Sequence, residues 1–126
     1  MPDPRYSLNI EVQTRYLQEE SVPEDNRFVF AYTITIQNTG DVAARLMKRA
    51  WQITDSNGNI QEVTGEGVVG EQPRLEPGEG FRYSSGAVLE TEVGTMSGSY
   101  TMLADDGLEF DVEIPKFTLS TPRTLH

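Results

Sequence analysis

The chain contains no cysteine and a single histidine, His126, at its last position. Without cysteine there are no disulfides, no thiolate metal sites and no cysteine nucleophile. A terminal histidine is a poor member of a catalytic triad, because chain ends are usually poorly ordered. Ser84 and Ser85 have no evident activating base, and the two lysines, Lys48 and Lys116, lie in strand-like segments. The sequence therefore predicts a protein that is not an enzyme and needs no cofactor.

Long apolar runs and basic residues are also scarce. No segment approaches the ~18 apolar residues of a membrane span, and the opening MPDPRYSLNI lacks the apolar core of a signal peptide. The chain has 10 Lys or Arg against 20 Asp or Glu, a formal net charge of −10. That charge repels nucleic-acid backbones and anionic membrane surfaces. We therefore expect a cytoplasmic protein that binds neither nucleic acid nor membranes.

Alternating apolar residues predict strands in place of helices. Segments 6–17 and 27–38 place apolar side chains at every second position, the period of half-buried strands. Trp51 is expected to fill the space between two sheets. Seven to eight strands predict an all-β, antiparallel sandwich of fibronectin type III-like or immunoglobulin-like form, as one domain over residues 1–126. The other expected strands are 42–55, 60–65, 81–86, 97–104 and 108–119.

Two strand-like segments change their apolar parity. In 42–55 the change predicts a bulge near Met47–Ala50, because a one-residue slip turns every side chain to the other face. Arg45 and Arg49 flank this position and are expected to be solvated at the surface; pairing with loop carboxylates or binding of an anion are the alternatives. Pro115 marks the second change, since proline cannot donate to a β-ladder.

Turn signals separate these strands. The segment SNGN, residues 56–59, contains Asn57 and Gly58, which both tolerate positive φ. Asp105, Asp106 and Gly107 form a second signal. The two aspartates are also weak candidates for binding a hard cation such as magnesium. Turn chemistry already explains both residues, so no metal site is predicted.

The segment 65–80 interrupts the strand pattern with glycines and prolines, and its Gly65-x-Gly67-x-x-Gly70 has the spacing of a dinucleotide-binding turn. Such a turn feeds a helix whose N-terminus faces the pyrophosphate, but Pro77 would break that helix. Three interpretations stay open: a chain crossing between sheets, an anion nest for a pyrophosphate or nucleotide fragment, or a loop that contacts a protein partner. The candidate residues are Gly65, Gly67, Val68, Val69, Gly70, Glu71, Gln72 and Pro73.

An ordered series of motifs runs through residues 51–102. It comprises Trp51-x-Ile53-x-Asp55, the unbroken Gly65-Glu-Gly-Val-Val-Gly-Glu-Gln-Pro73, Pro77-Gly78-Glu79, Tyr83-x-Ser85-Gly86, Leu89-x-Thr91 and Gly94-x-Met96-x-Gly98-x-Tyr100. In this order and spacing the series resembles the ApaG domain, and IPKFTLSTP near the end resembles that family's closing strand. The resemblance extends from about Tyr6 onward.

The resemblance implies a fibronectin type III-like sandwich in a stand-alone, cytoplasmic bacterial protein of poorly defined biochemical function. It also implies a genetic association with cobalt and magnesium handling, and protein–protein contacts in eukaryotic relatives. We therefore expect a binding module with an unidentified protein partner, which uses loop 65–80 with segments 84–86 and 89–98. Binding of a small anion or of a divalent cation is the alternative. An exposed edge strand leaves a monomer or a weak homodimer open.

Overall fold

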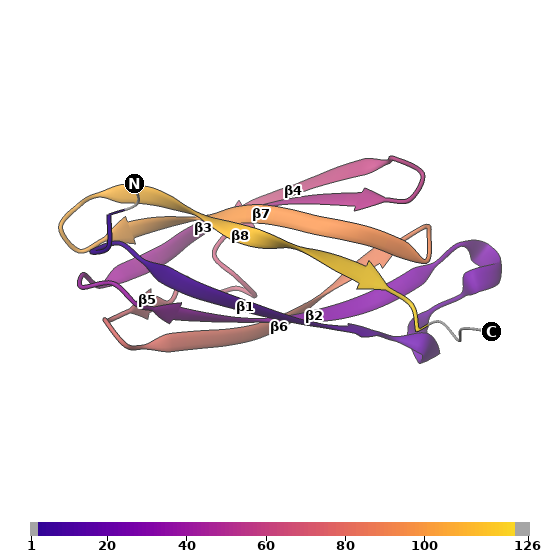
Figure 1. Ribbon diagram of the computed structural model, residues 1–126, viewed down its shortest axis with the longest axis horizontal. Coiled ribbons are helices and arrows are strands. Elements are labelled where there is room, and N and C mark those ends of the chain that lie inside the picture. The colour runs from indigo at the N-terminus through magenta and orange to yellow at the C-terminus, as the bar shows by residue number, and fades with distance from the viewer. Residues whose placement is uncertain (1–2, 123–126) are drawn as a thin grey trace.

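The computed structural model describes residues 3–122, which form two antiparallel sheets packed face to face (Figure 1). The first sheet has the order β1 (Leu8–Tyr16), β2 (Phe28–Asn38) and β6 (Gly80–Leu89). The second has the order β4 (Ile60–Glu66), β3 (Ala44–Asp55), β7 (Val93–Ala104) and β8 (Glu109–Ser120), and the short β5 (Arg74–Leu75) also pairs with β3. The predicted all-β, fibronectin type III-like sandwich is confirmed, with eight strands.

The β1–β2 connection is the only helical part of residues 3–122, and its helices are short 3-10 turns. They are η1 (Gln18–Glu20) and η2 (Pro23–Asp25). Within that described range, no helix has the length and apolar character to cross a membrane.

The core lies between the sheets and is built on β2. Ile34 and Ile36 of this strand have no exposed surface, and burying such a side chain stabilises a fold by about 2 kcal/mol. Trp51 packs edge-on against Tyr32 and Phe117, with ring centroids 5.6 and 5.8 Å away, an arrangement that aromatic rings favour. The expected core position of Trp51 is therefore confirmed.

Both predicted changes of register are present. The pairing of β3 with β7 shifts at Met47, so that Leu46 and Trp51 both point into the core. The pairing of β7 with β8 shifts at the Pro115–Lys116 step. A bulge leaves a residue outside the ladder, and this accommodates a proline that has no amide to donate.

Segment 65–80 is more regular than the sequence predicts. We expected one long connection, but β4 continues to Glu66, Val68 and Glu71 form an isolated β-bridge, and Arg74–Leu75 pairs with β3. Apolar periodicity could not reveal these elements, because β4 is exposed on both faces and β5 has only two residues.

The 56–59 turn also differs in detail from the expectation. Gly58 has a φ of 84°, whereas Asn57 does not have a positive φ. The Asp55 carboxylate accepts the amides of Asn57 and Asn59 at 2.9 and 3.0 Å. The aspartate side chain thus fixes a turn that needs a left-handed residue only at glycine.

Candidate functional site

The glycine-rich segment 65–73 is tied to β3 by two arginines. Arg49 Nη1 donates to the carbonyl oxygens of Glu66 and Gly67 at 3.0 and 2.8 Å. Arg45 Nη1 donates to the carbonyl oxygen of Gln72 at 2.8 Å. Arg45 is exposed at the surface, as expected, whereas Arg49 is partly buried; both guanidinium groups bind the backbone of the loop. They act as internal anchors from the strand to the loop.

Met47 supplies a further anchor. Its carbonyl oxygen accepts the amide of Gly67 at 2.8 Å and the side-chain amide of Gln72 at 3.0 Å. Gly67 and Gln72 lie on either side of the tip of the loop, so one carbonyl ties both sides. The bond from Gly67 continues the unshifted register of β3 with β4, whereas the bulge at Met47 interrupts only the pairing of β3 with β7. The loop is therefore placed by the end of the β3–β4 ladder.

The tip of the loop is a two-residue turn. Val68 and Glu71 exchange both backbone hydrogen bonds, at 2.8 and 2.9 Å. Between them Val69 and Gly70 have φ values of 42° and 80°, the two positive values of a type I′ turn. Val68 is fully buried in the core, whereas the side chain of Val69 is 54% exposed. A β-branched residue at positive φ is a genuine outlier, and such strain costs about 1–3 kcal/mol.

The glycines of the motif differ in the space around them. A Cβ on Gly67 would lie 2.1 Å from the carbonyl oxygen of Glu71, and one on Gly65 would lie 2.9 Å from the Arg49 guanidinium. A Cβ on Gly70 would meet no atom within 4 Å. Close packing against backbone therefore requires Gly67, whereas the contact at Gly65 is with the movable end of the Arg49 side chain and Gly70 serves only the dihedral of the turn. The segment does not cross between the sheets as that interpretation expected, because β4 before it and β5 after it both pair with β3 of the second sheet; the chain reaches the first sheet only between β5 and β6.

The same geometry bears on anion binding. The amides of Gly67, Val68 and Glu71 already donate to backbone carbonyls. The element that follows Gly70 is the strand β5, so the motif lacks the helix of a dinucleotide site. The amides of a nest must be free to face an anion. Anion binding at residues 65–73 stays a prediction that would require these bonds to rearrange.

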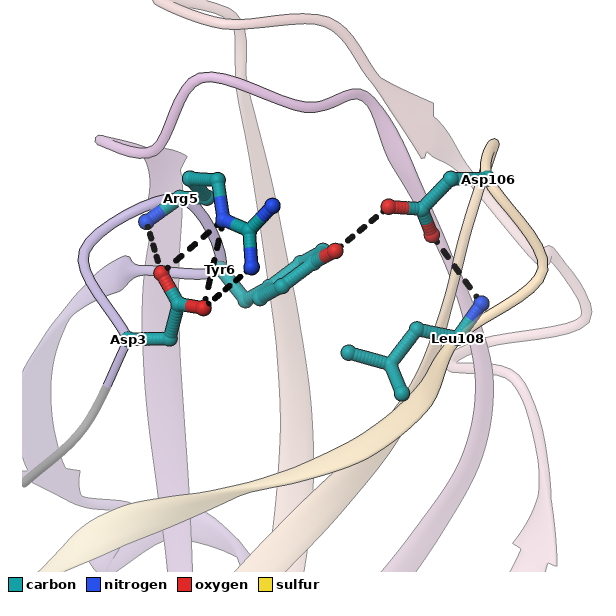
Figure 2. A network of polar contacts seen from close by, with 5 residues as sticks. All are labelled: Asp3, Arg5, Tyr6, Asp106 and Leu108. Atoms are coloured by element: carbon teal, nitrogen blue, oxygen red, sulfur yellow. Dashed lines mark hydrogen bonds and ion pairs between the residues drawn. The ribbon is translucent and has the colours of Figure 1, made fainter.

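Asp106 is one of the two weak metal candidates and is part of a polar network at the β7–β8 turn (Figure 2). Its carboxylate accepts the amide of Leu108 at 3.0 Å and the hydroxyl of Tyr6. The hydrogen bond from Tyr6 holds the pKa of the Asp106 carboxyl below its usual value. Arg5 lies over the Tyr6 ring, 5.1 Å from its centroid, and pairs with Asp3. This network ties the N-terminal segment to the β7–β8 turn.

Asp105, the second candidate, forms an ion pair with Arg74 of β5. The Arg74 guanidinium lowers the pKa of the Asp105 carboxyl. The φ of Gly107 is 93°, which confirms the predicted turn. Across residues 3–122, no group of three or more His, Asp or Glu is placed to hold a metal ion. Both aspartates have protein partners that explain their positions.

Of the remaining sequence candidates, Ser84 lies apart from the loop, whereas Lys48 lies beside its start. Ser84 Oγ forms a 2.6 Å hydrogen bond with Thr33 Oγ1. Ser84 lines a shallow hollow of about 470 Å³ on the first sheet with Gln13, whereas the loop is bonded to β3 of the second sheet. Lys48 lines a separate hollow of about 310 Å³ beside Gly65. His126 lies outside the described residues.

Sequence reasoning missed the anchoring role of Arg49 and the strained position of Val69. A signal for Arg49 was present, because it shares strand parity with the core residues Trp51 and Ile53. An arginine on a core-facing parity needs internal acceptors, and the loop supplies them. No comparable signal existed for Val69, since valine is among the residues least expected at positive φ.

The fold and the anchored loop define a class of protein: a fibronectin type III-like sandwich with a glycine-rich loop that the arginines of β3 hold at the edge of the second sheet. The ApaG domain family model matches residues 18–104, and the chain belongs to this family. It is 60% identical over 124 residues to Protein ApaG of Xanthomonas campestris, covering 98% of each chain. It is 62% identical over 122 residues to Protein ApaG of Thiobacillus denitrificans, covering 97% of this chain and 96% of the relative.

A solved structure supports the same assignment. A crystal structure of an ApaA protein from Bordetella pertussis superposes with a TM-score of 0.93 at 47% identity. The match covers 98% of this chain and 100% of the other. At this identity the two chains share their fold over nearly their full length.

Proposed function

We propose that this chain is a non-enzymatic, cytoplasmic docking module that holds a protein partner with the turn at residues 68–71. The pathway it serves touches cobalt and magnesium homeostasis, as the resemblance to the ApaG family implies. The partner is a protein because the feature presented to solvent is an apolar side chain on a fixed turn. Loops held by a rigid scaffold commonly carry the binding residues of a protein.

The observation that carries this proposal is the conformation of Val69. Its side chain is 54% exposed and contributes little to the core, yet its φ of 42° is unfavourable for valine. Asparagine before Gly70 would suit the turn better, because Asn-Gly favours type I′ geometry. Strain at an exposed site that a simple substitution would relieve is typical of functional positions.

The anchors around the turn support the same conclusion. Arg45, Arg49 and the Met47 carbonyl fix the loop on both sides of the tip. A loop that is already ordered loses little conformational entropy when a partner binds. The structure thus presents Val69 on a preorganised support.

Photocrosslinking in the native host tests the proposal. We would replace Val69 by a benzophenone amino acid and identify crosslinked proteins by mass spectrometry. The matched control carries the same group at Leu108, a 44% exposed apolar residue at the β7–β8 turn. We expect one defined protein to crosslink at position 69 and not at 108.

Substitutions then test the chemistry of the contact. Val69→Asn removes the apolar anchor and relieves the strain, so it should lose the partner while the protein melts at a higher temperature. Val69→Ile keeps the anchor and should keep the partner. Unchanged capture by the Val69→Asn protein would overturn the proposed docking surface.

A further inference from the structure

The strand that leads into this turn has an open edge. β4 is the outermost strand of the second sheet and forms a border of the molecule in Figure 1. The backbone amide of Asp55 donates to the carbonyl oxygen of Asn59, and the backbone amide of Gly67 donates to that of Met47. Bonded and non-bonded pairs alternate along an antiparallel ladder, and the β3–β4 register has no shift between these ends. It follows that the backbone groups of Ile60, Glu62 and Thr64 point away from β3. The ladder turns Glu66 outward as well, but its carbonyl oxygen already accepts a hydrogen bond from Arg49.

β4 lacks the features that protect other edges from pairing. Edge strands usually carry proline, a bulge or charged side chains, especially lysine, to prevent association; the only charges of β4 are Glu62 and Glu66. β8, at the opposite edge of the same sheet, has Pro115, Lys116 and a shift of register. β4 has no proline, no basic residue and no shift, and six of its seven residues are exposed. Its edge is therefore open to another strand.

Apolar side chains and negative charge are concentrated at this edge. Six large apolar side chains are exposed among residues 3–122, and three of them lie here: Ile60, Val63 and Val69. The twenty residues from Thr54 to Pro73 include no Lys, Arg or His. They include four acids, namely Asp55, Glu62, Glu66 and Glu71. The edge thus offers apolar contacts within a negative field.

We propose that β4 pairs with an extended, basic segment of the partner protein, which adds an antiparallel strand to the second sheet. The inference rests on the proposed function and identifies the kind of partner. Main-chain hydrogen bonds supply affinity in this mode and alternate side chains supply specificity. Antiparallel pairing is chosen because every pairing in both sheets is antiparallel.

The register of β4 sets the sequence of the added strand. Directly opposed residues interact across a sheet, so basic residues should face Glu66 and Glu62, and apolar residues should face Val63 and Ile60. Read from its N-terminus, the partner segment is basic-x-x-apolar-basic-x-apolar. A second copy of this chain is disfavoured as the occupant, because each copy carries a net charge of −10.

A synthetic peptide with this pattern tests the pairing. We would titrate acetylated, amidated Lys-Thr-Thr-Val-Lys-Thr-Val into the labelled protein and follow amide shifts by NMR. We expect shifts along Ile60–Glu66, with an affinity that weakens as salt is raised. The same peptide with Glu in place of both Lys should not bind. Equal binding of both peptides, or an absence of shifts in β4, would overturn the proposal.

Backbone methylation separates strand addition from simple charge attraction. The third and fifth peptide residues face Thr64 and Glu62, where the backbone groups of β4 point outward. N-methylation at both should weaken binding at least about tenfold, because two hydrogen bonds are lost. N-methylation of the fourth and sixth residues is the matched control, since those amides point away from β4. Equal weakening by both patterns would reject strand addition.

Variants of the protein test the same edge from the other side. Thr64→Pro removes an outward amide that β3 does not use, and proline is tolerated at such edge positions. It should fold normally and lose the peptide. The double change Glu62→Lys with Glu66→Lys should also lose it, whereas Glu11→Lys with Glu113→Lys alters the net charge equally and should bind. Sedimentation that shows a dimer abolished by Thr64→Pro would reject the basic partner in favour of self-pairing.

Two outcomes distinguish this inference from the docking proposal. If Val69→Asn loses the cellular partner but Thr64→Pro retains it, the turn is the docking surface and strand addition is wrong. If neither change affects capture, the docking proposal itself fails.

Discussion

Two tight turns of this sandwich reach similar geometry with different residues. In the turn at 104–108 the left-handed position is occupied by Gly107, and the Asp106 carboxylate accepts the backbone amide of Leu108. At 68–71 one of the two left-handed positions is occupied by Val69. The first turn has residues suited to their positions, and its two aspartates also bond to Arg74 and Tyr6. The second needs support from β3, and the strain is located where an apolar side chain is presented to solvent. Local rules are kept where the turn only connects strands and broken where we propose that it binds.

The largest expected effect is on the packing inside the 68–71 turn. Gly67→Ala places a methyl group 2.1 Å from the Glu71 carbonyl oxygen at a φ of 61°, so the turn must deform. We expect a loss of about 3–4 kcal/mol in the free energy of unfolding, measured by urea denaturation. Gly70→Ala is the control, because it has a φ of 80° but no atom within 4 Å. That change should cost about 1 kcal/mol, and equal losses would show that steric contact at Gly67 is unimportant.

The support from β3 gives the next largest effect. Arg49→Met removes a partly buried guanidinium that serves two loop carbonyls. We expect a loss of about 2 kcal/mol in unfolding free energy and faster amide exchange at residues 66–72. Arg45→Met removes a single exposed hydrogen bond and should cost about 0.5 kcal/mol. If both arginines cost the same, the carbonyl pair at Glu66 and Gly67 is not the main anchor.

Removing the backbone strain at Val69 should stabilise the protein, whereas the substitutions above destabilise it. Val69→Asn gives the turn an Asn-Gly pair, which suits positive φ at both positions. The free energy of unfolding should rise by about 1 kcal/mol. The slope of that free energy against urea concentration should not change. Val69→Ile retains the β-branched side chain and should leave stability unchanged. A destabilised Val69→Asn protein would show that the valine contributes packing that outweighs its strain.

The sequence predicts the parts of this fold that follow local rules. Alternation identified the strands other than β4 and β5, parity changes located the shifts at Met47 and Pro115, and Gly107 marked its turn. The candidate loop was located as well, but its structure was not. The anchors of that loop depend on contacts between distant residues, such as Arg49 with Gly67. The conformation of Val69 contradicts its own preference, so only the tertiary structure could reveal it.

The smallest expected effect is a difference in the pH at which the two turns lose structure. Hydrogen bonds hold the carboxyl pKa values of Asp105 and Asp106 below their ordinary value of 3.8. A depressed pKa contributes stability that is present above the ordinary pKa and is lost as pH falls through the folded-state pKa. Acidification below pH ~3.8 should therefore loosen the 104–108 turn first. The hydrogen bonds from Arg49 end on backbone carbonyls, which do not titrate, so the 68–71 turn should retain its structure to lower pH.

NMR amide exchange from pH 6 downward would measure this order, and Asp106→Asn should reduce the pH dependence at Leu108 alone. Loss of protection at both turns at the same pH would mean that the sandwich unfolds as one unit before either turn responds.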